Sequence, residues 1–184
     1  MRLDLAPDAQ LISDARQLWL DPIIVRQSCD AIAQKLTVQL PAQENLFTKN
    51  AKDFEGHIDD FLREFDSRMQ AIAGMKVLVL SHDFSALDFR LKLVEVSPVN
   101  ASPLGLSDDQ VRQMQRAVEA QRPAAMLVDI GTPAAVQRDL AGRLGLPVIG
   151  IDALGSSAGN GHNTYLGMMR FDYEQLAGMA ATGK

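Results

Sequence analysis

Four short apolar runs in the second half of the chain limit the fold more than any other feature of the sequence. Each is apolar and partly β-branched, which is typical of a buried strand. Helical patterns alternate with these runs, so we expect an α/β fold: a four-stranded parallel sheet with flanking helices. Right-handed crossovers favour the strand order 2-1-3-4. The runs are KVLVLSHD (76–83), LVEVSPV (93–99), AAMLVDI (124–130) and LPVIGIDAL (146–154).

Capping residues mark three helices in this half. We expect Ser107 to cap the helix that follows it, and Thr132 with Pro133 to cap the next one. Gly145 is a natural end for that helix, because glycine adopts the left-handed conformation at low cost. A last helix is expected to begin at about Thr164.

The first part of the chain predicts two helices. Asp21 and Pro22 form a helix start, with proline at a position where its missing N–H costs nothing. Pro41 separates this helix from a longer one over about 42–73, and Gly74 ends the second. The pair is expected to form an antiparallel hairpin or to lie along another layer. The apolar positions at helical spacing are Val25, Cys29, Ile32 and Leu36 in the first helix, and Phe47, Ala51, Phe54, Ile58, Phe61, Phe65, Met69 and Ile72 in the second.

This change of pattern divides the chain into two parts. Residues 1–74 are interpreted as an N-terminal segment with a long two-helix linker or hairpin, and residues 75–184 as an α/β lobe. A chain of 184 residues is long enough for one full core with appended helices. Its 47% hydrophobic and 22% charged residues indicate a globular protein.

Charge and hydropathy exclude several classes of protein. A net charge of −5 argues against a nucleic-acid partner, which would need a basic surface. We expect no membrane span, because no apolar run is long enough, and no signal peptide in this chain, because MRLDLAPDAQ lacks an apolar core. The single cysteine, Cys29, cannot form an internal disulfide and lies on an apolar helix stripe, which indicates packing.

Polar residues at the strand ends are the candidate site. In open α/β sheets ligands bind at the carboxyl ends of the strands, where this sequence places His82, Asp129 and Asp152. Imidazole and carboxylate together suit zinc or manganese. Two other roles stay open. Asp83 and Asp129 can cap the helices that follow them, and His82 can serve only to hydrogen-bond a loop.

The sequence does not predict an enzyme. It has no GxGxxG after the first strand, no GxxxxGK[ST] and no GxSxG, so nucleotide phosphate binding and a nucleophile elbow are disfavoured. An enzyme that uses His82 with Asp83 or Asp129 as acid and base groups is the least favoured hypothesis, because no nucleophile or cofactor motif supports it.

The order of the motifs resembles a known family. LWLDP opens the first helix, SHDFSAL ends the first strand, and MLVDIGTPAAVQRDLAGRLGLPVIGIDALG precedes NTYLGMMRFDYEQLAGM. This series, from Gln17 to Met179, resembles the second lobe of the zinc/manganese-type solute-binding proteins of metal ABC transporters, the zinc-receptor and adhesin-lipoprotein family. The resemblance implies two α/β lobes joined by a long helix, with the metal between them. The first lobe has no counterpart here.

The resemblance also implies a ligand set. His82 matches the family's histidine after the first strand of that lobe, and Asp152 matches its carboxylate ligand. Gln17 stands two residues before Trp19, where the family usually has histidine. A neutral glutamine oxygen is a weaker zinc ligand than imidazole. Gln17 and Asp129 are therefore weaker candidates, and we expect weak metal binding that depends on His82.

Two functions follow as expectations. The first is a lobe that binds zinc, or alternatively manganese, in a periplasmic or extracytoplasmic solute-binding protein, with the membrane subunit of an ABC importer as partner. The second is a divergent or truncated relative that has lost tight metal binding and acts as an interaction module or homodimer, through the surface left by the missing lobe. In either case Trp19 and Leu20 are expected to dock the incoming chain against the lobe.

Overall fold

A parallel sheet forms the centre of the lobe. The computed structural model describes residues 17–80, 84–97, 99–155 and 164–182. Strands β1 (Lys76–Leu78), β2 (Val94–Val96), β3 (Ala125–Asp129) and β4 (Val148–Ile151) all pair in parallel, in the order β2-β1-β3-β4. The expected fold class and strand order are confirmed, although each strand is shorter than its apolar run.

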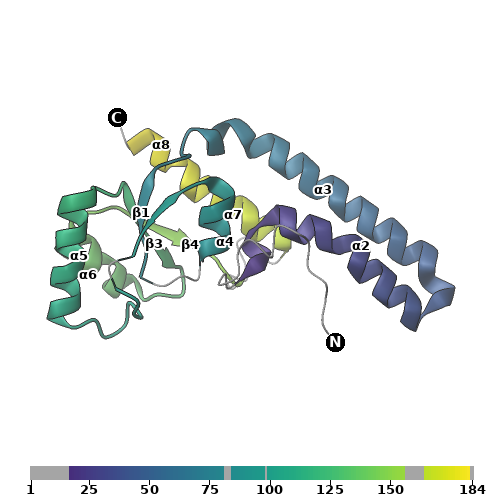
Figure 1. Cartoon of the computed structure of the whole chain (residues 1–184), viewed down its shortest axis with the longest axis horizontal. Helices are drawn as coiled ribbons and strands as arrows, with labels where there is room; N and C mark the ends of the chain where they lie inside the picture. The colour runs from purple at the N-terminus through teal and green to yellow at the C-terminus, as the bar shows by residue number, and fades with distance from the viewer. Residues whose placement is uncertain (1–16, 81–83, 98, 156–163, 183–184) are drawn as a thin grey trace.

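The sheet lies between two layers of helices (Figure 1), and alternate residues of its strands pack against one layer or the other. Leu78, Met126 and Val128 pack with the helices α5 (Asp108–Gln121) and α6 (Ala134–Leu144). Val77 and Leu127 face the other layer of helices. This layer consists of α4 (Ser85–Leu91), the C-terminal part of α3 (Glu44–Gln70), α7 (Tyr165–Ala177) and the short α8 (Met179–Thr182). Both faces of the sheet are therefore buried, as the continuous apolar runs predict.

The expected hairpin precedes the lobe and extends beyond it (Figure 1). A 3-10 turn, η1 (Leu18–Leu20), leads into α2 (Pro22–Gln39), and a second turn, η2 (Pro41–Gln43), leads into α3. Arg26 on α2 and Asp59 on α3 form an ion pair at 2.7 Å between the two helices. No helix in the described ranges is both long enough and apolar enough to cross a membrane.

The end of α3 ties the hairpin to the sheet. Phe61 and Phe65 lie in the main core, where their rings contact the ring of Tyr173 on α7 with centroid distances of 4.9 and 5.5 Å. Such a cluster buries a large apolar area in the centre of the fold. The division of the chain between residues 74 and 75 stays a prediction.

Most expected capping residues are confirmed, with one correction. The side chain of Ser107 accepts the N–H of Gln110 in a capping box, and Gly145 ends α6 with a φ of 65°. The expectation that Thr132 caps α6 is wrong. The backbone of Pro133 is extended, with a ψ of 134°, so α6 begins at Ala134, one residue later than expected, and Pro133 occupies the N-cap position without a side-chain cap.

One helix was not predicted. Helix α4 is a seven-residue segment between β1 and β2, too short for a clear apolar periodicity. It carries a buried carboxyl group: Asp88 is 4% exposed, and neither of its carboxyl oxygens has a hydrogen-bond partner among the described residues. Its neighbour Arg90 reaches back to Asp21 at the start of α2, at 2.7 Å.

Candidate functional site

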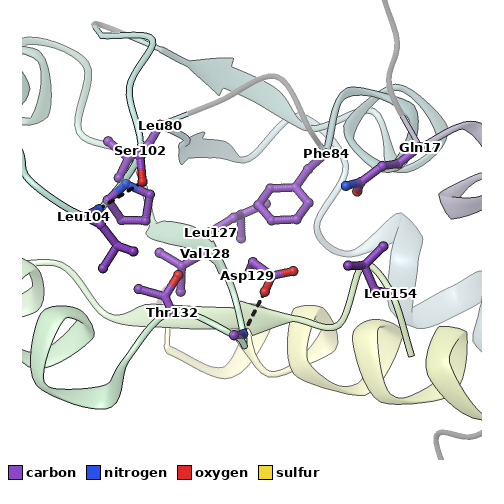
Figure 2. Close-up of a pocket in the computed structure, with 12 residues that line it drawn as sticks. Gln17, Leu80, Phe84, Ser102, Leu104, Leu127, Val128, Asp129, Thr132 and Leu154 are labelled. Carbon is purple, nitrogen blue, oxygen red and sulfur yellow. Dashed lines mark hydrogen bonds between the residues drawn. The ribbon is translucent and has the colours of Figure 1, made fainter. Parts of the chain in front are cut away.

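A cleft of about 390 Å³ opens at the carboxyl edge of the sheet. Figure 2 shows Phe84 and Asp129 projecting into it, with Gln17 and Leu154 towards one end and Leu104 towards the other. The strands β1, β3 and β4 all end at this edge, so segments distant in sequence meet here. The described residues that line the cleft are Gln17, Leu80, Phe84, Ser102, Pro103, Leu104, Leu127, Val128, Asp129, Gly131, Thr132 and Leu154.

Gln17 is held in an uncommon backbone conformation at the cleft. Its φ of 57° and ψ of 50° lie in the left-handed region, which is disfavoured for residues other than glycine. Its side-chain oxygen Oε1 is buried and has no hydrogen-bond partner among the described residues. A buried acceptor of this kind is costly unless something donates to it or binds it.

Asp129 is the last residue of β3, and its carboxylate lies at the centre of the cleft in Figure 2. Its Oδ1 accepts the N–H of Gly131 at 2.7 Å, which orients the side chain. A Cβ on residue 131 would lie 2.7 Å from the same Oδ1, so glycine is required for this arrangement. The side chain of Asp129 does not cap α6, so the alternative capping role is not the one observed.

Asp152 follows β4 and is fully buried. It is not among the described residues that line the cleft. Its backbone N–H donates to Oδ1 of Asp172 on α7 at 2.7 Å. Burial raises the pKa of Asp172 to about 7, against the lowering effect of this hydrogen bond, and the nearby carboxylates of Asp152 and Asp129 raise it further. The carboxyl groups of Asp129, Asp152 and Asp172 therefore lie near one another at this edge of the sheet.

Neither His82 nor His57 belongs to the described lining of the cleft. His82, the strongest expected ligand, lies outside the described residues, as does Asp83, whereas Leu80 and Phe84 on either side both line the cleft. His57 is exposed on α3, as expected for a solvated face residue. Within the described ranges, no group of three or more His, Cys, Asp or Glu side chains is placed to hold a metal ion.

The segment 17–21 connects the cleft with the rest of the lobe. The indole Nε1–H of Trp19 donates to the carbonyl of Ala153 at 2.7 Å, so this segment docks on the lobe as expected. Trp19 itself is 42% exposed, whereas Leu20 is fully buried. Asp21 caps α2 by accepting the N–H of Ile23 and also accepts from Arg90.

Comparison with known proteins identifies the family and the fold. The model of the family "Zinc-uptake complex component A periplasmic" (ZnuA) matches residues 14–179. The chain belongs to this family. The ZnuA family consists of uptake components and not of enzymes. No curated protein sequence matches the chain significantly.

Solved structures with the same fold include three bacterial proteins. A mutant of the laminin-binding adhesin Lmb from Streptococcus agalactiae is 21% identical, with a TM-score of 0.72 over 89% of this chain and 62% of its own. The Zn(II)-bound ZnuA-like domain of AdcA from Streptococcus pneumoniae is 16% identical, with a TM-score of 0.77 over 96% and 66%. FpvC from P. aeruginosa in complex with Mn²⁺ is 14% identical, with a TM-score of 0.77 over 91% and 63%. This chain thus spans about two thirds of their length, and at such identities the likeness establishes the ZnuA fold.

Sequence reasoning missed two residues of the site region. Phe84 follows the SHD motif and contributes a ring to the cleft, but an aromatic residue before a seven-residue helix carries no periodic signal. Asp172 lies on α7, next to Tyr173 in the sequence and within the range that the ZnuA family model matches. The signal that could have identified it is an acidic residue between apolar neighbours in a helix that covers the sheet, because such a residue is buried only for a specific partner.

Proposed function

We propose that this chain is a metal-binding lobe of an ABC-transporter solute-binding protein, with a divalent metal as its cargo. The observation that carries the proposal is the edge of the sheet, where Asp129 and the buried oxygen of Gln17 line a cleft, with Asp152 buried close by, in a member of the ZnuA family. Zinc is the proposed cargo and manganese the alternative. Structural relatives have been solved with Zn(II), Mn²⁺ or Ni²⁺ bound.

His82 and Asp152 are the principal ligands of this proposal, with Gln17 and Asp129 as weaker ones. An imidazole suits zinc, while carboxylate and amide oxygens suit manganese equally well, so the donor set fits a borderline divalent ion. Because the described residues do not close a site by themselves, binding depends on His82. The location of the lobe in the periplasm or another extracytoplasmic space, and delivery to an ABC importer subunit, belong to the same proposal.

Calorimetry on metal-free protein tests it directly. The wild type is expected to bind zinc or manganese, and His82→Ala to abolish binding. His57→Ala is the matched control, because it removes one imidazole from the exposed face of α3 and leaves the cleft intact. Equal loss in both variants, or no heat of binding for either metal at millimolar concentration, would contradict metal capture by this chain.

Gln17→His examines the same site by gain of function. A histidine in this place puts an imidazole at the edge of the cleft, where the glutamine oxygen has no partner among the described residues. We expect zinc affinity to rise by at least about tenfold, as for a better donor in a preformed site. An unchanged zinc affinity in a folded variant would place the metal elsewhere.

A second candidate function is supported by the rim of the cleft. Leu104 and Leu154, both lining it, are 57% and 69% exposed, and Trp19 nearby is 42% exposed. Exposed apolar groups around a cleft favour a protein partner, including a second copy of this chain. Light scattering after size exclusion tests this function. A dimer that Leu104→Ser with Leu154→Ser dissociates supports it, and a monomer at all concentrations contradicts homodimerisation.

A further inference from the structure

The backbone immediately after β4 is held from two sides. From one side, the carboxylate of Asp172 on α7 accepts the N–H of Asp152 at 2.7 Å. From the other, the indole of Trp19 donates to the carbonyl of Ala153, also at 2.7 Å. The peptide unit between Asp152 and Ala153 is thus flanked by hydrogen bonds to two elements that are far from it in sequence.

The buried position of Asp172 is unfavourable for a carboxyl group. It is fully buried on the face of α7 that packs against the sheet, and its Oδ2 has no hydrogen-bond partner among the described residues. A buried carboxylate destabilises the fold unless it is well paired, and an apolar side chain of similar size would pack at lower cost. Among the described residues, its carboxyl group makes one specific interaction, the hydrogen bond that it accepts from the Asp152 amide. Packing alone does not account for a carboxyl group here.

We infer that Asp172 is a positioning residue that orients Asp152 for metal capture, an inference that rests on the function proposed above. The bond fixes the direction of the Asp152 N–H and, with it, the direction in which the Asp152 side chain leaves the backbone. Partners that orient a ligand strongly affect metal affinity, since a ligand displaced by about 1 Å binds poorly. The effect acts through Asp152, and Asp172 itself does not bind the metal.

Two substitutions at residue 172 separate hydrogen bonding from charge. Asp172→Ala removes the acceptor, and zinc and manganese affinity measured by calorimetry is expected to fall by about ten- to a hundredfold. Asp172→Asn keeps an acceptor oxygen at the same distance from the backbone. Because the hydrogen bond to the Asp152 N–H is retained, metal affinity is expected to stay within about threefold of the wild type. Met169→Ala is the control for packing, because Met169 is an equally buried residue of α7 in the same core cluster. It is expected to lower stability while leaving metal affinity unchanged.

Amide hydrogen exchange at Asp152 gives a readout that needs no metal. The amide is expected to be protected in the wild type, in Asp172→Asn and in Met169→Ala, and to exchange much faster in Asp172→Ala. If the wild type binds no metal but this exchange pattern holds, the proposed function fails while the positioning contact stands. If Asp172→Ala does not fold, Asp172→Asn still decides: loss of affinity or of protection in this variant overturns the inference. Wild-type affinity in a folded Asp172→Ala overturns it as well.

Discussion

Asp88→Asn is expected to stabilise the protein in a manner that depends on pH. Asp88 lies on α4, is 4% exposed, and has no hydrogen-bond partner for either oxygen among the described residues. Burial, with a smaller contribution from the nearby Glu95 carboxylate, raises the pKa of Asp88 from 3.8 to about 8. The folded protein therefore holds this carboxyl group protonated at neutral pH, whereas the unfolded chain ionises it.

The size of the effect follows from this difference in pKa. Because the folded pKa is the higher one, the stability that Asp88 contributes is complete below about pH 4 and is lost as the pH rises to about 8. At pH 7 the gap from 3.8 is about three pH units, and each unit corresponds to about 1.4 kcal/mol, so the expected cost is about 4 kcal/mol. Asparagine has nearly the same shape and cannot ionise, so Asp88→Asn removes this cost.

Urea unfolding followed by circular dichroism between pH 4 and pH 9 measures the effect. The free energy of unfolding of Asp88→Asn is expected to exceed that of the wild type by an amount that grows with pH and approaches about 4 kcal/mol at pH 7. Asp60→Asn is the control, because Asp60 is exposed on α3 and its substitution should stay within about 0.5 kcal/mol at any pH. A constant difference between Asp88→Asn and the wild type across this pH range would refute the reasoning, because it would show that ionisation of Asp88 is not coupled to folding.

Three further substitutions test the lobe. Asp21→Ala should cost about 3–5 kcal/mol in urea unfolding, because it removes a helix cap and leaves Arg90 without its buried partner, whereas Asp21→Asn should retain the cap and cost less. Gly131→Ala should displace the Asp129 carboxylate and lower metal affinity in calorimetry with little loss of stability; unchanged affinity would remove Asp129 from the ligand set. Phe65→Ala should cost about 3–5 kcal/mol, and a smaller loss would show that α3 contributes less to the core than its aromatic contacts indicate.

The sequence predicted the architecture well because the main signals are local. The apolar runs became buried strands, and their parallel order followed from crossover handedness. Asp21, Ser107 and Thr164 marked helix starts by their capping chemistry, which depends on neighbouring residues alone. Thr132 does not cap α6 because the helix begins one residue later than its sequence signal indicates, after an extended Pro133, and boundaries of this kind are the least certain part of a sequence-based prediction.

Part of the cleft lining was anticipated from the sequence, while the ligand roles stay predictions. The strand-end rule singled out Asp129 and the family resemblance singled out Gln17, and both residues line the cleft at the carboxyl edge of the sheet. The sequence could not show that Asp152 is fully buried or that Asp172 accepts its N–H, since that contact joins the end of β4 to a helix twenty residues later. The role of His82 stays a prediction. Trp19 shows the same limit. Its docking on the lobe was expected, but its exposed fraction depends on the tertiary structure around the edge of the sheet.

The hydrogen bond between Trp19 and Ala153 gives the protein an intrinsic optical probe. Trp19 is the only tryptophan in the chain, and its indole is bonded one residue away from Asp152. Its emission therefore reports on the polarity and hydrogen bonding of this edge of the sheet with no background from other tryptophans. A ligand or partner that covers the rim should shift the emission to shorter wavelength, so occupancy of the cleft can be followed in real time without a label.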